Sequence, residues 1–296
     1  MSWLKKELLV QQIANFSAQL FEIRLCRIGS IRPCHRQSER HVEIYGHGYE
    51  VGEIVMPLYF IGDAVKLDID RGPYNSGRTY LKAFLDILRH INATKLASDD
   101  DEDVELGEKM QDICASLTTV IPRYFPHQSD REPTMLYHHD LSLMNILVDA
   151  EGNLSSIVDW ECVVAVPAYE ACELPEFLKG QPYALTDCPP ALSANADADS
   201  IKYNRENIAS YECGRLRGSF LKEMERISPQ WMETFRHERV RHDIVLAIKY
   251  ATQEMTMGPV RGWLGMLARG DVPKTSLTDA SRSREALFQA DWVIGS

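Results

Sequence analysis

The most informative segment of this chain is Leu136-Tyr-His-His-Asp-Leu-Ser-Leu-Met-Asn-Ile-Leu-Val-Asp149, together with the nearby run Ile157-Val-Asp-Trp-Glu161. Three polar residues stand in these two stretches at fixed distances along the sequence. Asp140 comes first, Asn145 follows five positions later, and Asp159 lies nineteen positions after Asp140. Carboxylate and amide oxygens at such regular offsets suggest a polar site assembled from one continuous piece of chain.

The residues between these three anchors predict a tight β-hairpin. Asn145 to Val148 and Leu154 to Val158 are short apolar runs. The five residues 149–153, Asp-Ala-Glu-Gly-Asn, are rich in turn formers, so we expect Asp149 and Asn153 to serve the turn. Such a hairpin would bring Asp159 back beside Asn145, and its apolar residues would anchor the polar groups on a rigid element.

The pattern His-x-Asp-Leu-x-x-x-Asn, with a further Asp after a hairpin, resembles the catalytic loop and the metal-binding Asp of the protein-kinase-like superfamily. The ending Ile157-Val-Asp-Trp-Glu161 resembles that of aminoglycoside phosphotransferases and choline kinases, and the segment around His138-His139-Asp140 is similar to fungal members. The resemblance covers nearly the whole chain as a C-terminal lobe. It implies one domain over 1–296 that is mainly α with short β hairpins, an α+β fold.

The resemblance also implies a role for each anchor. Phosphoryl transfer needs positioning and charge neutralisation more than covalent chemistry. Asp140 would accept the proton of the substrate hydroxyl, and His138 would brace the catalytic loop. Asn145 and Asp159 would bind Mg²⁺ and through it the co-substrate ATP, because hard oxygen ligands suit this ion. The expected function is transfer of phosphate from ATP to a hydroxyl of a small molecule.

A complete member of the superfamily also has an N-terminal lobe, which supplies a phosphate-covering loop and a strand Lys paired with a helix Glu. Gly46, Gly48 and Gly52 fall one residue off the fingerprint of that loop, and we expect them to be turn glycines. Lys66 is the nearest mimic of the Lys, but it lacks the expected strand and helix. We therefore expect this lobe to be absent and the isolated chain to be weakly active or inactive, as a truncation, a fragment or a degenerate homologue.

Two alternatives remain open. A pseudoenzyme that binds a ligand or partner would fit the missing Lys, whereas the retained Asp140, Asn145 and Asp159 indicate descent from an active enzyme. A metal-dependent phosphohydrolase would place the His139-Asp140 doublet on a helix, but here the doublet precedes a hairpin. A zinc hydrolase of the His-Glu-x-x-His type is excluded, because the chain has no such run.

Composition narrows the range of partners. The net charge of -11, from 43 acidic and 32 basic side chains, disfavours nucleic acid and anionic membranes and would suit a cationic substrate. Seven cysteines without a Cys-x-x-Cys pair argue against a disulfide framework or a zinc site. With no signal-peptide pattern and no run of about 18 apolar residues, we expect a cytoplasmic protein.

The remaining elements follow from hydrophobic periodicity. Glycine-punctuated runs between 28 and 57 predict two or three short strands, and 58–75 should be irregular. The acidic segment 98–105 is typical of a helix start. Glu170, where the resembling families carry a helix-capping Asp, should be structural. Helices are expected over 3–25, 76–91, 106–121, 168–178, 203–226 and 231–256 and near 279–293, with a loop over 181–199.

Overall fold

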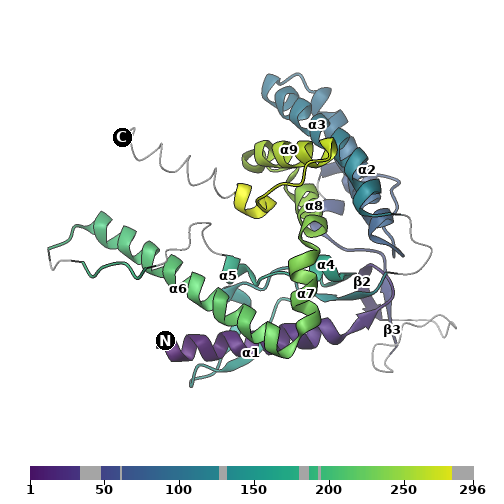
Figure 1. The fold of residues 1–296 in the computed structure, drawn as a ribbon. Helices are drawn as coiled ribbons and strands as arrows, with labels where there is room; N and C mark the ends of the chain where they lie inside the picture. Colours follow the sequence, from purple (N-terminus) through teal and green to yellow (C-terminus); the bar gives the residue numbers. More distant parts are fainter. Residues whose placement is uncertain (34–47, 61, 127–131, 180–186, 193–194, 282–296) are drawn as a thin grey trace. The chain divides into compact units, whose positions relative to one another are not determined.

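The computed structural model describes residues 1–33, 48–60, 62–126, 132–179, 187–192 and 195–281 (Figure 1). Helices and antiparallel β-sheet together form this part of the chain, which confirms the α+β class. The chain divides into two compact units. The first comprises Met1–Glu22, His138–Glu161 and Cys172–Phe235, and the second comprises Ile23–Tyr137, Cys162–Ala171 and Arg236–Ser296.

The first unit is built on two long helices and one hairpin. Its helices are α1 (Trp3–Glu22), α5 (Glu176–Lys179) and α6 (Ala198–Ile227), joined by most of α7 (Pro229–His237). Its hairpin consists of β5 (Ile146–Val148) and β6 (Leu154–Ile157), preceded by the short 3-10 helix η3 (Leu143–Asn145).

Helix α1 runs beside α6, as Figure 1 shows. Its buried residues Val10, Ile13 and Ala14 share one face, because residues three and four apart lie on the same side of a helix. The buried residues of α6 are Phe220 and Met224, close to its C-terminal end. The first unit therefore packs around the later turns of α6, while the earlier turns carry no buried side chain.

The second unit contains the larger sheet and the larger core. Its strands are β1 (Arg24–Leu25), β2 (Gly29–Pro33), β3 (Tyr49–Gly52), β4 (Thr134–Tyr137) and β7 (Val164–Pro167), in the antiparallel order β1-β4-β7-β2-β3. Its helices are α2 (Gly77–Leu96), α3 (Asp101–Tyr124), α4 (Ala168–Ala171), α8 (Arg239–Tyr250) and α9 (Glu254–Arg269), with the 3-10 helices η1 (Pro57–Tyr59) and η2 (Gly62–Lys66).

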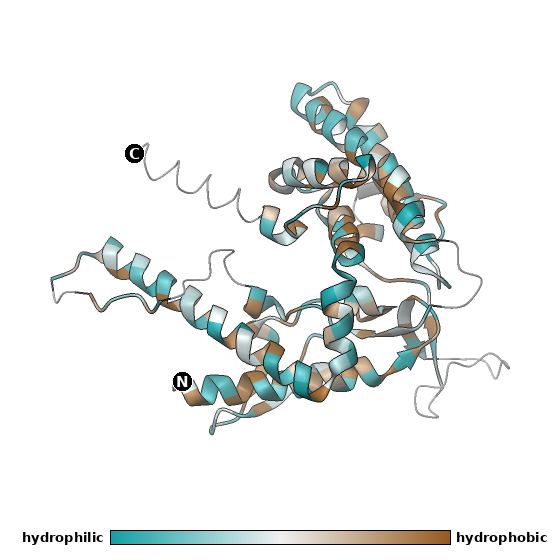
Figure 2. Cartoon of the chain, in the orientation of Figure 1, coloured by the Kyte–Doolittle hydropathy of each residue, from teal (hydrophilic) through white to brown (hydrophobic). Residues whose placement is uncertain are grey.

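Burial explains why these helices pack together. Helix α2 packs on α3, and α3 packs on α9, through apolar faces that bury residues such as Phe84, Leu117 and Leu264. Helix α8 is hydrophobic around most of its middle, where Ile244–Ile248 are all buried (Figure 2). The start of α3 is stabilised by Asp100, whose carboxylate accepts a hydrogen bond from the Glu102 amide at 2.9 Å.

Several predicted elements have the predicted bounds to within five residues: α1, α2, α3, α6 and the hairpin. The strands predicted between 28 and 57 correspond to β2 and β3 in the described part of that segment. The acidic segment does begin a helix, since Asp101, Glu102 and Asp103 form the first turn of α3. Most of the helix predicted near 279–293 lies outside the described residues.

Two segments that were predicted as single helices are each divided into two helices, so these two predictions are wrong. The helix expected over 168–178 is divided into α4 and α5, because Pro175 disfavours helical dihedral angles at the residue before it. The helix expected over 231–256 is divided at Glu238, where α7 ends and α8 begins. The two halves of that segment belong to different cores, since Trp231 is buried in the first unit and Ile244 in the second.

Helix α9 was not predicted, because Pro259 and three glycines lower its helix propensity. Burial of Val260, Trp263, Leu264 and Leu267 in the second unit outweighs that cost. Within the described residues, no helix combines the length and the apolar character that a membrane span requires.

We predict that Leu117→Ala lowers the free energy of unfolding by about 2–5 kcal/mol, because the lost side chain leaves a cavity between packed helices. Urea unfolding followed by circular dichroism measures this change. Thr119→Ala on the exposed face of α3 is the matched control and should stay within about 0.5 kcal/mol. Equal effects of the two substitutions would contradict the packing of α3 described above.

Candidate active site

The predicted hairpin is present, and its register places two of the anchors close together. Strands β5 and β6 pair antiparallel, with Ile146 opposite Ile157. The pairing continues one step further, because the Val158 amide donates to the Asn145 carbonyl at 3.0 Å. Asp159 is the next residue after Val158, so the hairpin brings it to the position beside Asn145 that the sequence predicted.

The turn of the hairpin is closed by its own polar residues. The Asp149 carboxylate accepts a hydrogen bond from the Asn153 amide at 2.8 Å, and the Asp149 amide donates to the Asn153 carbonyl at 2.9 Å. The hydrogen bonds from Asn153 hold the pKa of the Asp149 carboxyl below its usual range. Gly152 has φ of 90°, a left-handed conformation that favours glycine. Asp149 and Asn153 therefore serve the turn, as expected.

Asn145 is joined directly to Asp140. Its Nδ2 donates to the Asp140 backbone carbonyl and to the Asp140 carboxylate Oδ2, both at 2.9 Å. Asn145 is buried, with 8% of its surface exposed, and Asp140 is half-buried. The amide of Asn145 thus fixes both the backbone and the side chain of Asp140, and it leaves the other carboxylate oxygen, Oδ1, for another partner.

His138 joins the start of the loop to the end of the hairpin. Its Nε2 lies 3.0 Å from the Val158 carbonyl, so this nitrogen carries the proton and donates. The His138 ring is 6% exposed and meets the Trp160 ring edge-on, with 4.8 Å between centroids. This position suits the bracing role that the resemblance implies for His138.

Asp159 has a different environment. Its φ of 64° lies in the left-handed region, which costs energy for a residue other than glycine. Its side chain is exposed, and among the described residues its carboxylate has no hydrogen bond or ion pair. The next residue, Trp160, is held in place because its indole nitrogen donates to the Ile157 carbonyl at 2.8 Å.

Three positioning contacts were not predicted from the sequence. The Gln12 side chain on α1 accepts a hydrogen bond from the Leu154 amide at 2.7 Å, and Phe16 on the same helix meets Trp160 edge-on at 5.9 Å. At the other side of the loop, the Glu176 amide donates to the Leu141 carbonyl at 3.1 Å. The amphipathic pattern predicted α1, but it carries no signal for which polar residue on that helix reaches the hairpin.

The oxygen donors of Asn145 and Asp159 are of the chemical kind that magnesium prefers. Because Asn145 uses its Nδ2 on Asp140, its Oδ1 lies on the opposite side of the amide group. Asp159 adds an exposed carboxylate. The described part of the chain holds no group of three or more His, Cys, Asp or Glu side chains arranged for a metal. Magnesium often binds through one or two protein oxygens together with water and substrate phosphates, so a small set of oxygen donors suits it.

The remaining residues singled out in the sequence lie in the second unit or outside the described residues. Glu170 is buried and accepts from Lys249 Nζ at 2.8 Å and from the Tyr80 hydroxyl at 3.4 Å, which fits the expected structural role. Burial raises the pKa of Tyr80 well above its ordinary value, so this hydroxyl stays protonated. Gly52 ends β3 and Lys66 ends η2, while Gly46 lies outside the described residues.

Comparison with known proteins adds no family assignment. The chain matches no protein-family model, no curated protein and no solved structure. The resemblance to the protein-kinase-like superfamily therefore depends on the motif residues alone. Its implications for fold and activity stay predictions.

We predict that His138→Ala loosens the end of the hairpin, because the Val158 carbonyl loses its donor and Trp160 loses a packing partner. The free energy of unfolding should fall by about 2 kcal/mol. The Val158 amide, which bonds Asn145, should exchange its hydrogen faster in an NMR exchange experiment. His139→Ala, at the neighbouring exposed position, is the control and should change both quantities much less. Similar effects of both substitutions would contradict the bracing role of His138.

Proposed function

We propose that this chain is the C-terminal lobe of a kinase-like phosphotransferase that transfers phosphate from ATP to a hydroxyl of a small molecule in the cytoplasm. The observation that carries the proposal is the double hydrogen bond from Asn145 to Asp140, in a loop whose hairpin returns Asp159 beside Asn145. These three residue types at these offsets are those that phosphoryl transfer uses for a proton acceptor and two metal ligands.

In this proposal Asp140 is the catalytic residue that touches the substrate. Its Oδ2 is held by Asn145, and its Oδ1 receives the proton of the substrate hydroxyl. As that hydroxyl oxygen bonds to the γ-phosphorus, the bond from phosphorus to the bridging oxygen breaks and ADP leaves. A carboxylate already held in one orientation supports this step, because catalysis here depends on positioning.

Asn145 and Asp159 complete the site. The Asn145 Oδ1 and the Asp159 carboxylate would hold a magnesium ion, whose positive charge would neutralise the phosphate oxygens. The exposed position of Asp159 leaves its carboxylate open to a nucleotide complex arriving from solvent. Its left-handed backbone lies between two residues that are held in place, because the Val158 amide donates to Asn145 and the Trp160 indole donates to Ile157.

The acceptor is proposed to be a small alcohol that carries positive charge. The net charge of -11 favours the approach of a cation and disfavours nucleic acid or an anionic membrane surface. Family members identified by the same motif phosphorylate hydroxyls of aminoglycosides, choline and related compounds. An amino alcohol is therefore the first class of acceptor to test.

The alternative is a pseudoenzyme that binds a ligand or a partner without turnover. One observation favours it: the sequence has no strand Lys of the kind that contacts nucleotide phosphates in active kinases. Loss of one electrostatic contact to the transition state typically costs about 3–4 kcal/mol, enough to reduce the rate several hundredfold. The two functions share the binding of magnesium and ATP and differ in turnover.

We predict that the chain binds ATP in a magnesium-dependent manner and that Asp159→Asn abolishes the binding, because a neutral amide is a poorer ligand than a carboxylate. Calorimetry measures the affinity. A thermal-shift assay should show stabilisation of about 2.7 kcal/mol when ATP is present at a hundred times its Kd.

Asp149→Asn is the matched control for this experiment, because Asp149 lies in the same hairpin but serves the turn. It should bind ATP as the unchanged chain does. No binding at millimolar ATP, or binding that Asp159→Asn leaves unaltered, would contradict the metal site.

A second prediction separates the enzyme from the pseudoenzyme. Asp140→Asn should keep magnesium-dependent ATP binding but lower turnover by about 10²–10⁴-fold, because the hydroxyl loses its proton acceptor. The measurement is ADP release with a panel of amino alcohols and aminoglycosides. Turnover that survives in Asp140→Asn would contradict the role of Asp140. Binding without turnover against any acceptor would favour the pseudoenzyme.

A further inference from the structure

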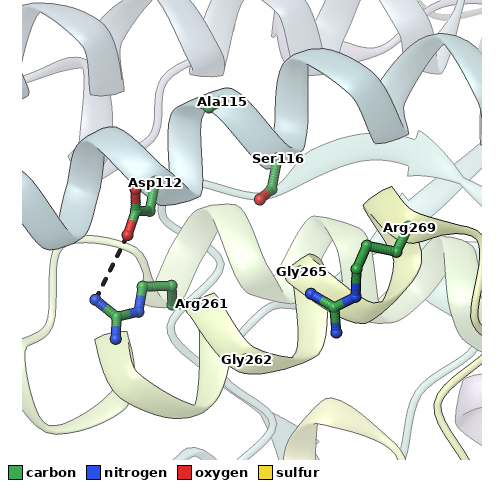
Figure 3. A pocket seen from close by; sticks show the side chains of 7 residues that line it. All are labelled: Asp112, Ala115, Ser116, Arg261, Gly262, Gly265 and Arg269. Atoms are coloured by element: carbon green, nitrogen blue, oxygen red, sulfur yellow. Dashed lines mark hydrogen bonds and ion pairs between the residues drawn. The ribbon is translucent and has the colours of Figure 1, made fainter.

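The second unit contains a pocket that the proposed function does not use. It lies between α3 and α9, has a volume of about 520 Å³ and is drawn in Figure 3. Its lining residues are all exposed or half-buried, so it is an open pocket at the surface of the second unit. The lining residues are Asp112, Ala115, Ser116, Arg261, Gly262, Gly265 and Arg269.

The pocket exists because two helix positions lack side chains. A Cβ placed on Gly262 would meet no other atom within 4 Å, and one placed on Gly265 would meet only Arg269 Nη1, at 3.4 Å. Glycine inside a helix costs about 1 kcal/mol relative to alanine. Since an alanine would fit at Gly262 without a clash, packing against the rest of the fold does not require glycine there. Gly262 and Gly265 therefore leave open space beside α9.

Two arginines face this space. The Arg269 guanidinium folds back along α9 to the level of Gly265, and within the described ranges it has no ion pair (Figure 3). Arg261 contacts Asp112 at 3.5 Å, and both side chains are more than half exposed, at 52% and 64%. Exposed pairs of this kind contribute little energy. The lining therefore carries one net positive charge, on a chain whose total charge is strongly negative.

The Arg269 guanidinium does not lie at the C-terminal end of α9. An arginine in the last turn of a helix often neutralises the negative end of the helix dipole. Here Arg123 of α3 already does so, because its Nη1 donates to the Leu267 carbonyl at 3.4 Å and lies 3.5 Å from the Cβ position of Gly270. Arg269 instead turns away from that end and lies over Gly265.

We propose that the pocket between α3 and α9 binds a small molecule that carries two linked phosphate groups. A guanidinium matches the oxygens of a phosphate with two parallel hydrogen bonds. Both guanidinium groups line the same pocket, that of Arg269 at the level of Gly265 and that of Arg261 on the side of Asp112. Two guanidinium groups that line one pocket can each bind one phosphate group, which favours a ligand with two phosphates over a single oxyanion. The Ser116 hydroxyl points from α3 toward α9 and adds a further donor (Figure 3).

The test is calorimetric titration of the full chain with inorganic diphosphate, at low salt and with EDTA in place of magnesium, so that the proposed nucleotide site does not contribute. We expect saturable binding that weakens as salt is added. Arg261→Gln and Arg269→Gln should each weaken it about tenfold, because each removes charged hydrogen bonds to phosphate. Arg226→Gln, at an exposed ion pair on α6, is the matched control and should leave it unchanged.

A second variant tests the space rather than the charge. Gly262→Leu should fill the pocket and abolish binding without lowering Tm, because the added Cβ meets nothing and leucine favours helix. Inorganic phosphate should bind more weakly than diphosphate. The proposal is overturned if diphosphate shows no saturable binding up to about 10 mM. It is equally overturned if Arg269→Gln and Gly262→Leu bind as the unchanged chain does, or if phosphate binds as tightly as diphosphate.

Discussion

The hydrogen bond from the Val158 amide to the Asn145 carbonyl sets the register on which the candidate active site depends. Side chains of a strand alternate between two faces, so a slip of one residue would send Asp159 to the other face of the hairpin. Three further contacts hold this register: the closed turn between Asp149 and Asn153, the hydrogen bond from His138 to Val158, and that from the Leu154 amide to Gln12. The hairpin is short, and its position comes from these contacts more than from strand pairing.

The three residues of the candidate site differ in how far the rest of the chain holds them in place. Asp140 and Asn145 are joined by two hydrogen bonds, and Asn145 is buried and Asp140 half-buried, whereas Asp159 is exposed and has a left-handed backbone. A proton acceptor benefits from being held in one orientation before the substrate arrives. A metal ligand that binds a magnesium–nucleotide complex from solvent benefits from being accessible to solvent. The arrangement therefore fits a site that is complete only when its ligand is bound, and the magnesium and ATP assigned to it stay proposals.

Charge is distributed unevenly over this acidic chain. Several of its cations are engaged in structural contacts, such as Lys249 with Glu170 and Lys6 with Glu212. Arg261 and Arg269 differ, because one makes a long, exposed contact and the other folds over a glycine. A positive pocket on a negative protein would concentrate anions locally while the rest of the surface repels them. In these proposals, net charge bears on the cationic acceptor, whereas the local arginines bear on the anion expected in the pocket between α3 and α9.

The sequence alone determined the local elements, and only the tertiary structure decided how they were divided and joined. Periodicity predicted α1, α2, α3 and α6, and turn residues predicted the hairpin, because these signals act within a few residues. The hydrogen bonds from Asn145 to Asp140 also join residues close in the sequence, within a single motif. Other features depend on contacts between segments that are distant in the sequence. They are the division of 231–256 at Glu238, the formation of α9 despite Pro259, the sheet order β1-β4-β7-β2-β3 and the hydrogen bond of Gln12 to the hairpin. The pocket between α3 and α9 also could not be predicted from the sequence. A glycine in the sequence indicates only a low helix propensity, and only the packing of the helices shows that it leaves space.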